Sequence, residues 1–279
     1  MPLTPTAALV ARAAAHGRGV GAFNVIQLEH AQAIVAGAQA AKAPVILQIS
    51  ENAVRYHGAL APIGRAVLAV AEAATVPVAV HLDHATSSDL VAEAVALGFG
   101  SVMFDASKLD YEQNVEATAK IVARCHAARC WVEAELGEVG GKDGVHAPGA
   151  RTDPREAAAF VEATGVDALA VAVGTSHAML TRDAALDFEL IGALRAAVPV
   201  PLVLHGSSGV ADRDLRTAVE RGMTKVNIAT HLNGVFTDAV RAALAADERL
   251  VDTRKYLGPA RSATAAEVTR LLGVLNSAC

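Results

Sequence analysis

The sequence predicts a single (β/α)8 (TIM) barrel over residues 1–279, with an N-terminal helix and an extra C-terminal helix added to it. About eight short β-branched segments alternate with longer Ala- and Leu-rich segments, at a spacing of about 25–35 residues that fits one strand plus one helix. The short segments are mostly continuous apolar runs, as expected of parallel strands buried on both faces. Eight such units favour a closed barrel over an open sheet.

The predicted strands are the apolar runs, taken in chain order. They span residues 19–25, 44–50, 76–84, 101–106, 130–136, 168–174, 201–207 and 225–231. A chain of this length suits either one barrel or two smaller domains. No linker rich in Gly, Pro and Ser divides the sequence, which favours one domain.

The intervening segments are predicted helices because their apolar residues recur at helical spacing, as at 29–42 and 111–126. Ser87 and the pair Asp153-Pro154 are typical of helix starts. Helices are expected to end at glycines, which tolerate a left-handed backbone. These glycines are Gly98, Gly165 and Gly222.

Further elements are predicted outside the regular units. A short Ala-rich helix covers residues 4–16, and a helix at 232–246, a turn-rich stretch at 247–261 and a last helix at 262–278 follow the eighth strand. The longest irregular stretch, 137–153, is rich in glycine. A loop of that length inside a compact domain is usually functional or mobile.

The composition excludes several classes of protein. The net charge of −5 with 19% charged residues argues against nucleic-acid binding, which usually needs a basic face. No run of 18 apolar residues is free of charges, so no membrane span is expected, and the N-terminus does not resemble a signal peptide. Three cysteines are too few for a disulfide framework and are interpreted as buried or incidental thiols. We therefore expect a cytoplasmic protein.

Polar residues cluster where the predicted strands end, which is where barrel enzymes place catalytic groups. Five of the ten histidines lie there, beside several acids. One or two of them could be structural, but five are better explained by a metal or acid–base site. His84, His177 and His205 are the predicted metal ligands, because three neutral imidazoles leave a divalent ion able to polarise a carbonyl.

A phosphate site is predicted after the last two strands, where barrels commonly bind phosphate. Gly206, Ser207 and Ser208 follow the seventh strand, and Asn227 to Thr230 end the eighth. Small residues let backbone N–H groups approach phosphate oxygens, and a helix N-terminus adds positive potential. The alternative is an ordinary turn between strand and helix.

Eight motifs in order resemble the class II (metal-dependent) fructose/tagatose-bisphosphate aldolase family, from about Ala22 to the end of the chain. They are AFNV (22–25), HLDHA (81–85), GFGSVMFDAS (98–107), VEAELGEVGG (132–141), DALAVAVGTSH (167–177), LVLHGSSGV (202–210), KVNIAT (225–230) and RKYLGPAR (254–261). The resemblance implies cleavage of a ketose 1,6-bisphosphate to dihydroxyacetone phosphate and glyceraldehyde 3-phosphate.

The resemblance also implies roles for individual residues. His84, His177 and His205 match zinc ligands, and Asp83 matches the acid–base residue that moves the proton of the substrate C4 hydroxyl. Asp105 and Glu135 match acids that contact the metal in some members, and the alternative for both is a hydrogen-bonded acid at the rim. The remaining matches are substrate-binding positions: Ser50, Ala178, Gly206, Ser207, Ser208, Asn227, Ile228, Ala229, Thr230 and Arg261. Arg254 is a further substrate-binding match.

The implied cofactor is one catalytic Zn²⁺ per subunit, and the resemblance allows a monovalent cation (Na⁺ or K⁺) as well. The implied partners are a phosphorylated sugar and further copies of the chain, as a homodimer or homotetramer. A lysine-based aldolase is the mechanistic rival, and it would want a lysine inside a buried strand. Only Lys225 starts a strand, and no lysine is predicted inside one.

Departures from the family pattern bear on the substrate. Ala178 stands where glycine is usual, Asp143 stands where many members have a glutamate, and Ala229 stands where fructose-type members have an acid. Ala229 favours a tagatose-type bisphosphate or another ketose phosphate, and the departures together motivate an aldolase that acts on another ketose 1-phosphate in a specialised pathway. A non-catalytic phosphosugar-binding homologue is a third alternative, but binding alone would need neither Asp83 nor the histidines.

Overall fold

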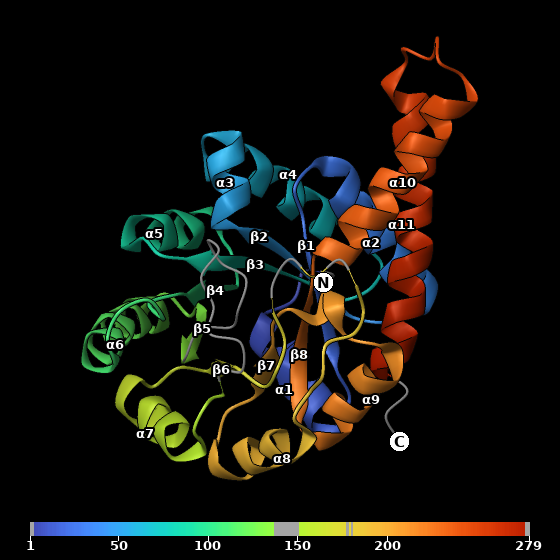
Figure 1. The fold of residues 1–279 in the computed structure, drawn as a ribbon. Helices are drawn as coiled ribbons and strands as arrows, with labels where there is room; N and C mark the ends of the chain where they lie inside the picture. Colours follow the sequence, from blue (N-terminus) through green and yellow to red (C-terminus); the bar gives the residue numbers. More distant parts are fainter. Residues whose placement is uncertain (1–2, 137–150, 177–178, 180, 277–279) are drawn as a thin grey trace.

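A computed structural model of the chain describes residues 3–136, 151–176, 179 and 181–276. Eight parallel strands close into a barrel in sequence order, and helices surround it (Figure 1), so the predicted (β/α)8 barrel is confirmed. The strands are β1 (Val20–Asn24), β2 (Val45–Ser50), β3 (Val78–Ala85), β4 (Ser101–Phe104), β5 (Trp131–Leu136), β6 (Ala168–Val171), β7 (Leu202–Leu204) and β8 (Met223–Ile228).

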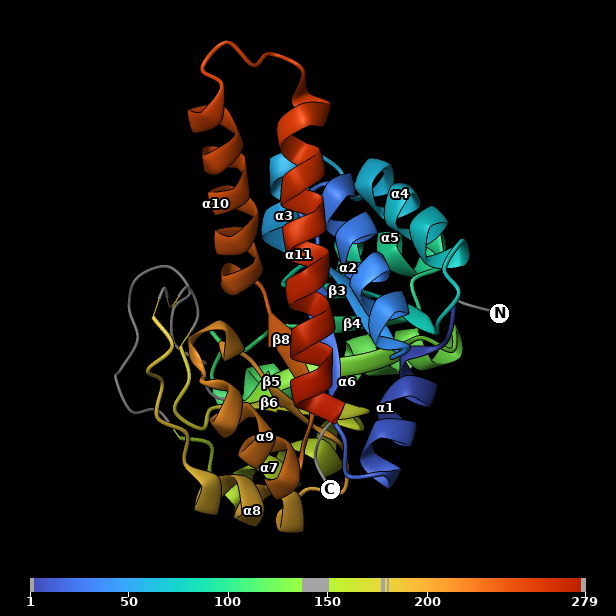
Figure 2. The ribbon, with the colours of Figure 1, turned by 90° about the vertical axis from the view of Figure 1, so that its right-hand side faces the viewer.

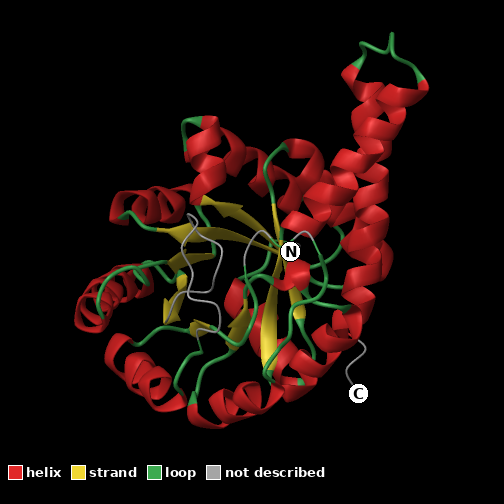
Figure 3. Cartoon of the chain, viewed as in Figure 1, coloured by secondary structure: helices red, strands yellow, loops and turns green. Residues whose placement is uncertain are grey.

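The helices form a ring outside the strands (Figure 3). They are α1 (Thr6–Ala15), α2 (Leu28–Ala41), α3 (Glu51–His57), α4 (Leu60–Glu72), α5 (Ser88–Leu97), α6 (Tyr111–Ala127), α7 (Pro154–Thr164), α8 (Phe188–Ala197), α9 (Asp212–Arg221), α10 (Thr230–Ala246) and α11 (Thr253–Asn276), with a 3-10 turn η1 (Ser207–Gly209).

The predicted helix ends agree with the structure. The Ser87 hydroxyl accepts a hydrogen bond from the Asp89 N–H at the start of α5, and the Asp153 carboxylate accepts one from the Arg155 N–H at the start of α7. Gly98, Gly165 and Gly222 end α5, α7 and α9, each at positive φ. These caps satisfy backbone groups that a helix terminus leaves without intrahelical partners.

Helix α1 closes the end of the barrel at which the strands begin. Its buried Leu9 and Val10 join an apolar cluster inside the barrel that includes Ile46, Met103 and Trp131. A separate, larger cluster fills the space between the strands and the outer helices. The barrel interior is therefore apolar at this end, and the opposite end carries the polar side chains.

The prediction for the C-terminal part was wrong in its boundaries. Helix α11 begins at Thr253, inside the stretch predicted to be turns, and contains Pro259. Gly258 and Pro259 disfavour a helix locally. Packing decides otherwise, because α11 lies along both α2 and α10, and the α10–α11 hairpin extends beyond the barrel (Figure 2).

The prediction for the eighth strand was also wrong. Strand β8 starts at Met223, where it pairs with Leu202 of β7, so Lys225 is the third residue of the strand and is fully buried. Thr224 and Lys225 break the apolar run that we used to locate the strand. Parallel pairing with β7 and polar partners inside the barrel keep these residues in the strand.

Alternate residues of a strand point to the same side, so polar residues two positions apart share the barrel interior. Three strands carry such pairs at the catalytic end. They are His81 and Asp83 on β3, Glu133 and Glu135 on β5, and Lys225 and Asn227 on β8. In the part of the chain that the structure describes, no helix is long and apolar enough to cross a bilayer.

Candidate active site

A cavity of about 360 Å³ opens at the carboxyl ends of the strands. Strands β1, β2, β3, β7 and β8 and the segments that follow them supply most of its wall. The predicted site residues that line it are Ser50, Asp83, His84, Asp105, His205, Gly206, Ser208, Asn227, Ala229 and Thr230. The barrel thus brings together residues that lie far apart in sequence.

The other predicted site residues that the structure describes do not line this cavity. The Ser207 hydroxyl donates to the Leu204 carbonyl oxygen, and the Ile228 side chain belongs to the hydrophobic core. Arg261 lies on α11 and donates a hydrogen bond to Gln32, and Arg254 pairs with Asp252 at the start of that helix. His177 and Ala178 lie outside the described residues, as does Asp143.

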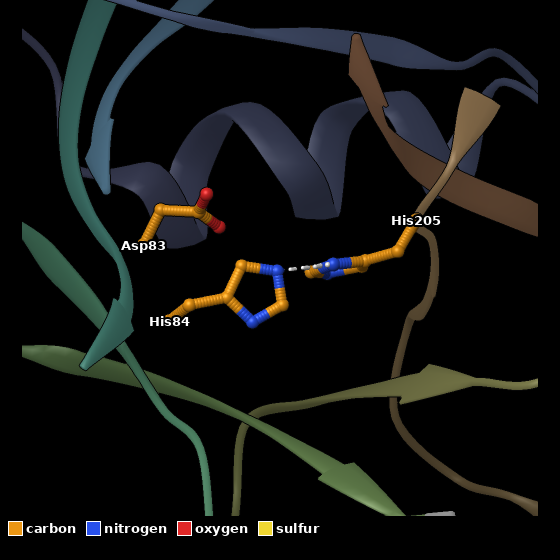
Figure 4. Close-up of side chains that lie close together, drawn as sticks. All are labelled: Asp83, His84 and His205. Carbon is orange, nitrogen blue, oxygen red and sulfur yellow. Dashed lines mark hydrogen bonds between the residues drawn. The ribbon is translucent and has the colours of Figure 1, made fainter. Parts of the chain in front are cut away.

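The rings of His84 and His205 meet at the end of the barrel nearly perpendicular to each other, with one nitrogen of each directed toward the other (Figure 4). His84 Nε2 lies 3.0 Å from His205 Nδ1, and the ring centroids are 4.7 Å apart. Asp83 offers a carboxylate oxygen within 4.8 Å of both rings. Two nitrogen ligands of a tetrahedral zinc ion are roughly 3.3 Å apart, so this pair of rings is close to a metal-binding arrangement.

Each ring has a carboxylate behind it. His84 Nδ1 donates to Asp105 Oδ2 over 2.8 Å, and His205 Nε2 donates to Glu133 Oε1 over 2.9 Å. Carboxylates only accept hydrogen bonds, so they hold the proton on the outer nitrogen of each ring. The inner nitrogens, which face each other, are left with lone pairs for a cation.

Asp105 and Glu135 also form a second group of possible ligands with His84, whose ligand atoms lie within 4.8 Å of one another. Asp105 therefore orients His84 in this structure and lies close enough to contact an ion itself. Glu135 is fully buried on β5. The role that the resemblance implies for both acids, contact with the metal in some members, stays a prediction for this chain.

A break in strand geometry aims His84 into the cavity. Regular alternation would point His84 away from the side that its neighbour Asp83 faces. The pairing of β3 with β4 shifts register between Leu82 and Ala85, and His84 adopts a φ of 50°. Bulges of this kind re-aim side chains next to active sites. Such a conformation costs about 1–2 kcal/mol for a residue other than glycine.

Asp83 is held by hydrogen bonds at both carboxylate oxygens. Asn24 Nδ2 donates to Oδ2 at 3.1 Å, and Asn227 Nδ2 lies 3.4 Å from Oδ1. Burial alone would raise the pKa of Asp83, but the positive charge that His84 or His205 carries when protonated, the charge of Lys225 and the Asn24 hydrogen bond hold that pKa below its usual value. Asp83 is therefore an oriented carboxylate that is ionised at neutral pH.

The opposite side of the cavity is suited to a phosphate. Gly206 has a φ of 66°, and a Cβ atom there would lie 2.6 Å from the Ser176 carbonyl oxygen, so the backbones meet closely. The Ser208 hydroxyl accepts hydrogen bonds from the N–H groups of Ala229 and His231. Helix α10 begins at Thr230, so its N-terminus faces this part of the cavity.

Of the histidines predicted at the rim, two have other roles. His81 lies deeper in the barrel and bonds to Ser101, and burial together with the charge of Lys225 lowers its pKa well below the usual value. His81 is therefore a neutral interior residue. His231 pairs with Glu267 on α11 at 2.6 Å, beside the cavity.

Sequence reasoning missed several residues of the cavity wall. Glu51, Asn52 and Arg55 come from α3, an additional helix directly after β2, and Lys108 follows β4 on another side. The Glu51 carboxylate accepts hydrogen bonds from the Thr86 N–H and from Arg55, which connects α3 to the end of β3. The Ser50 hydroxyl, which caps α3, is a signal that would have located this helix.

Comparisons with known proteins identify the family of the chain and agree with its fold. The profile of the family described as "Fructose-bisphosphate aldolase class-II" matches residues 4–279. A probable fructose-bisphosphate aldolase of Bacillus subtilis is 42% identical over 267 residues, with 94% of each chain covered. The fructose-bisphosphate aldolase of Thermus caldophilus is 40% identical over 282 residues, covering 91% of this chain and 92% of that one. The solved structure of the YdjI aldolase from Escherichia coli has a TM-score of 0.86 at 32% identity and covers 99% of this chain and 98% of that one.

Proposed function

The chain belongs to the class II fructose-bisphosphate aldolase family, whose members are carbon–carbon lyases, and on this premise we propose that it reversibly cleaves a ketose 1,6-bisphosphate. The products are dihydroxyacetone phosphate and glyceraldehyde 3-phosphate, and the sugar is of the fructose or tagatose type. The observation that carries the proposal is the pair of facing rings of His84 and His205, each backed by a carboxylate, beside Asp83.

We propose that His84, His205 and His177 hold one zinc ion. The donor set fits, because imidazole nitrogens with a nearby carboxylate suit zinc and other divalent ions of intermediate softness. When bound, the ion acts as a Lewis acid and stabilises negative charge that develops on substrate oxygens. A monovalent cation, Na⁺ or K⁺, remains a further proposal from the family resemblance.

Asp83 takes the proton of the C4 hydroxyl during cleavage and returns it during condensation. The two asparagine contacts fix its carboxylate, so that little reorganisation is needed when the proton moves. Its ionised state at neutral pH suits the role of a base in the cleavage direction. A positioned acid or base contributes about 10²–10⁴-fold to a rate.

We propose that the loop around Gly206 and Ser208, together with the N-terminus of α10, binds the C1 phosphate. The distal phosphate then lies toward Ser50, Arg55 and Lys108. Apart from the histidines, Arg55 and Lys108 are the cationic residues that line the cavity among those the structure describes. Arg261 and Arg254 do not line the cavity of their own subunit. Because the distal-phosphate arginine can come from a neighbouring subunit in this family, we propose that they serve the neighbouring subunit's cavity.

A second candidate is a related aldolase that acts on another ketose 1-phosphate. The observation that favours it is Ala229, which lines the cavity with a methyl group where fructose-type members carry an acid. Without that acid, one contact with the sugar hydroxyls is absent. This candidate uses the same residues for the metal, the proton and the C1 phosphate.

The test is cleavage of purified substrates by the zinc-loaded protein. Fructose 1,6-bisphosphate, tagatose 1,6-bisphosphate and fructose 1-phosphate are compared, with release of dihydroxyacetone phosphate as the readout. The first proposal is supported if one of the two bisphosphates has the highest kcat/KM of the three substrates. The ratio of the rates for the two bisphosphates then identifies the sugar. Turnover of the monophosphate alone would replace it with the second, and no turnover of any of the three would reject the first.

Three further proposals concern the whole molecule. We propose a homodimer or homotetramer, supported by the protruding α10–α11 hairpin, where Val251 is 89% exposed. Sedimentation as a monomer would contradict it. A cytoplasmic location is supported by the free, buried thiols of Cys125 and Cys130. That residues 1–279 form a single domain also stays a proposal.

A further inference from the structure

A buried ion pair lies beneath the metal-binding histidines, inside the barrel. Lys225 Nζ on β8 is 2.9 Å from Glu133 Oε2 on β5, and both side chains are fully buried. Neither residue lines the cavity, so neither contacts substrate there. The pair therefore influences the reaction only through the residues above it.

Glu133 links the pair to the metal site. Its other carboxylate oxygen, Oε1, accepts the hydrogen bond from His205 Nε2 at 2.9 Å. Asn227 Nδ2 also lies 3.2 Å from Nε2, but the carboxylate is nearer and can only accept, so the proton on Nε2 points to Glu133. This fixes the plane of the ring and directs Nδ1 toward His84.

Lys225 links the pair to the carboxylate that moves the proton. Its ammonium group donates to Asn227 Oδ1 at 2.8 Å. That contact orients the amide so that Nδ2 points toward Asp83 Oδ1, 3.4 Å away. Lys225 is fully buried, ion-paired with Glu133 and absent from the cavity wall, so it is not placed as a nucleophile for Schiff-base chemistry.

Stability alone does not account for the pair. Removing two charges from water is costly, and replacing a buried ion pair by apolar side chains of similar size is often neutral or stabilising. The apolar layer around Met103 and Val203, on the α1 side of the barrel, shows that the interior of this chain accommodates such side chains. Apolar residues at 133 and 225, however, would remove the acceptor of His205 Nε2 and the donor to Asn227 Oδ1 that Glu133 and Lys225 supply.

We propose that Lys225 and Glu133 are positioning residues for the aldolase reaction, orienting the metal ligand His205 on one side and, through Asn227, Asp83 on the other. The inference rests on the proposed metal-dependent function. This one buried pair then sets the position of the metal site relative to the acid–base residue Asp83. Groups of this kind typically contribute about 10–100-fold to metal affinity or activity.

The experiment measures zinc affinity, melting temperature and steady-state kinetics for four variants. Zinc dissociation constants come from competition with a chromophoric chelator, which does not depend on turnover. The variants are Lys225→Met, Glu133→Gln, the double variant Lys225→Met/Glu133→Leu, and the control Val67→Ala. Val67 is fully buried on the outer helix α4, so its truncation destabilises the barrel at a place outside the network.

Lys225→Met and the double variant are expected to bind zinc about 10–100-fold more weakly, and kcat is expected to fall while KM changes little. The double variant, which leaves no unpaired buried charge, is expected to melt near the wild-type temperature while zinc affinity stays low. Glu133→Gln keeps the shape of the side chain and an oxygen acceptor, so it folds and shows a smaller loss of the same kind. Val67→Ala is expected to melt lower and to bind zinc normally.

Recovery of zinc affinity and kcat together with stability in the double variant would overturn the proposal, since the pair would then be structural only. Wild-type affinity and kcat in Glu133→Gln would overturn it as well, even if other variants failed to fold. Failure of the proposed function gives a different result. In that case the wild-type protein itself binds no zinc and cleaves no ketose phosphate.

Discussion

Replacing Gly206 by alanine is expected to lower kcat/KM about 100-fold while the protein stays folded. Gly206 has a φ of 66°, and an added Cβ would lie 2.6 Å from the carbonyl oxygen and 2.8 Å from the carbonyl carbon of Ser176. Ordinary contact begins at 3.4 Å, so the two backbone segments must separate by about 0.8 Å, the difference from the shorter of these distances. A misplacement of about 1 Å in an active site can cost about 10²-fold in rate.

The affected segments adjoin the proposed site on both sides. Gly206 follows His205 directly, and Ser176 precedes His177 in the sequence. Alanine at positive φ also costs about 1–2 kcal/mol in stability, which corresponds to a melting temperature lower by about 2–8 °C. The assay couples release of dihydroxyacetone phosphate to its reduction by an NADH-dependent dehydrogenase, and thermal unfolding is followed in parallel.

Gly17→Ala is the matched control. Gly17 has a φ of 61°, and nothing lies within 4 Å of an added Cβ, so it reproduces the backbone strain without the collision. We expect a similar fall in melting temperature and a kcat/KM within about twofold of wild type. If Gly206→Ala kept kcat/KM within about threefold of the control, the close approach of the two segments would not position the site.

Three further predictions address the chemistry and the stability of the fold. Asp83→Asn keeps the shape of the side chain but cannot accept the proton, so kcat is expected to fall about 10²–10⁴-fold while the zinc content stays unchanged. A kcat near that of wild type would exclude Asp83 as the acid–base residue. Borohydride added during turnover is expected to leave the protein mass unchanged, because Lys225 is buried and ion-paired, whereas a substrate adduct on a lysine would establish the covalent mechanism. Burial alone would raise the pKa values of Asp212 and Glu267, but hydrogen bonds from Arg270, and from Arg182 and His231 respectively, hold both pKa values below their usual range. The contribution of the two carboxylates to stability is therefore present at neutral pH and is lost as the pH falls below about 4.5. The melting temperature of Arg270→Gln is therefore expected to be lower than that of wild type at pH 7. The loss corresponds to no more than about 1 kcal/mol, because Arg270 is half-exposed. The difference is expected to shrink below pH 4.5, and a difference that stays constant down to pH 3 would contradict this assignment.

The sequence was sufficient for the barrel because its signals are repeated and local. Each strand is an apolar run, and caps such as Ser87 and Asp153 mark helix starts through hydrogen bonds within a few residues. His84 and His205 could be placed together because strand ends meet at one rim of a barrel. That frame predicts that the two residues lie near each other, whereas the contact between their rings also needs the local shift that turns His84 inward.

The parts that could not be predicted depend on partners distant in sequence. The burial of Lys225 follows from Glu133, 92 positions earlier, and no local pattern reports that contact. The aim of His84 depends on a shift in pairing between β3 and β4. Helix α11 continues through Pro259 because it packs on α2 and α10. Polar residues two apart within apolar strands, as at 225 and 227, were the one available signal for the polar interior.

The central claim is that the chain is a metal-dependent aldolase whose ion is held by His84 and His205. The most direct test measures dihydroxyacetone phosphate release from fructose and tagatose 1,6-bisphosphates by wild-type protein, by chelator-treated protein, and by chelator-treated protein reloaded with zinc. The account predicts turnover that the chelator abolishes and that one equivalent of zinc per subunit restores, with no restoration in His205→Ala. Turnover that survives complete removal of metal would contradict it.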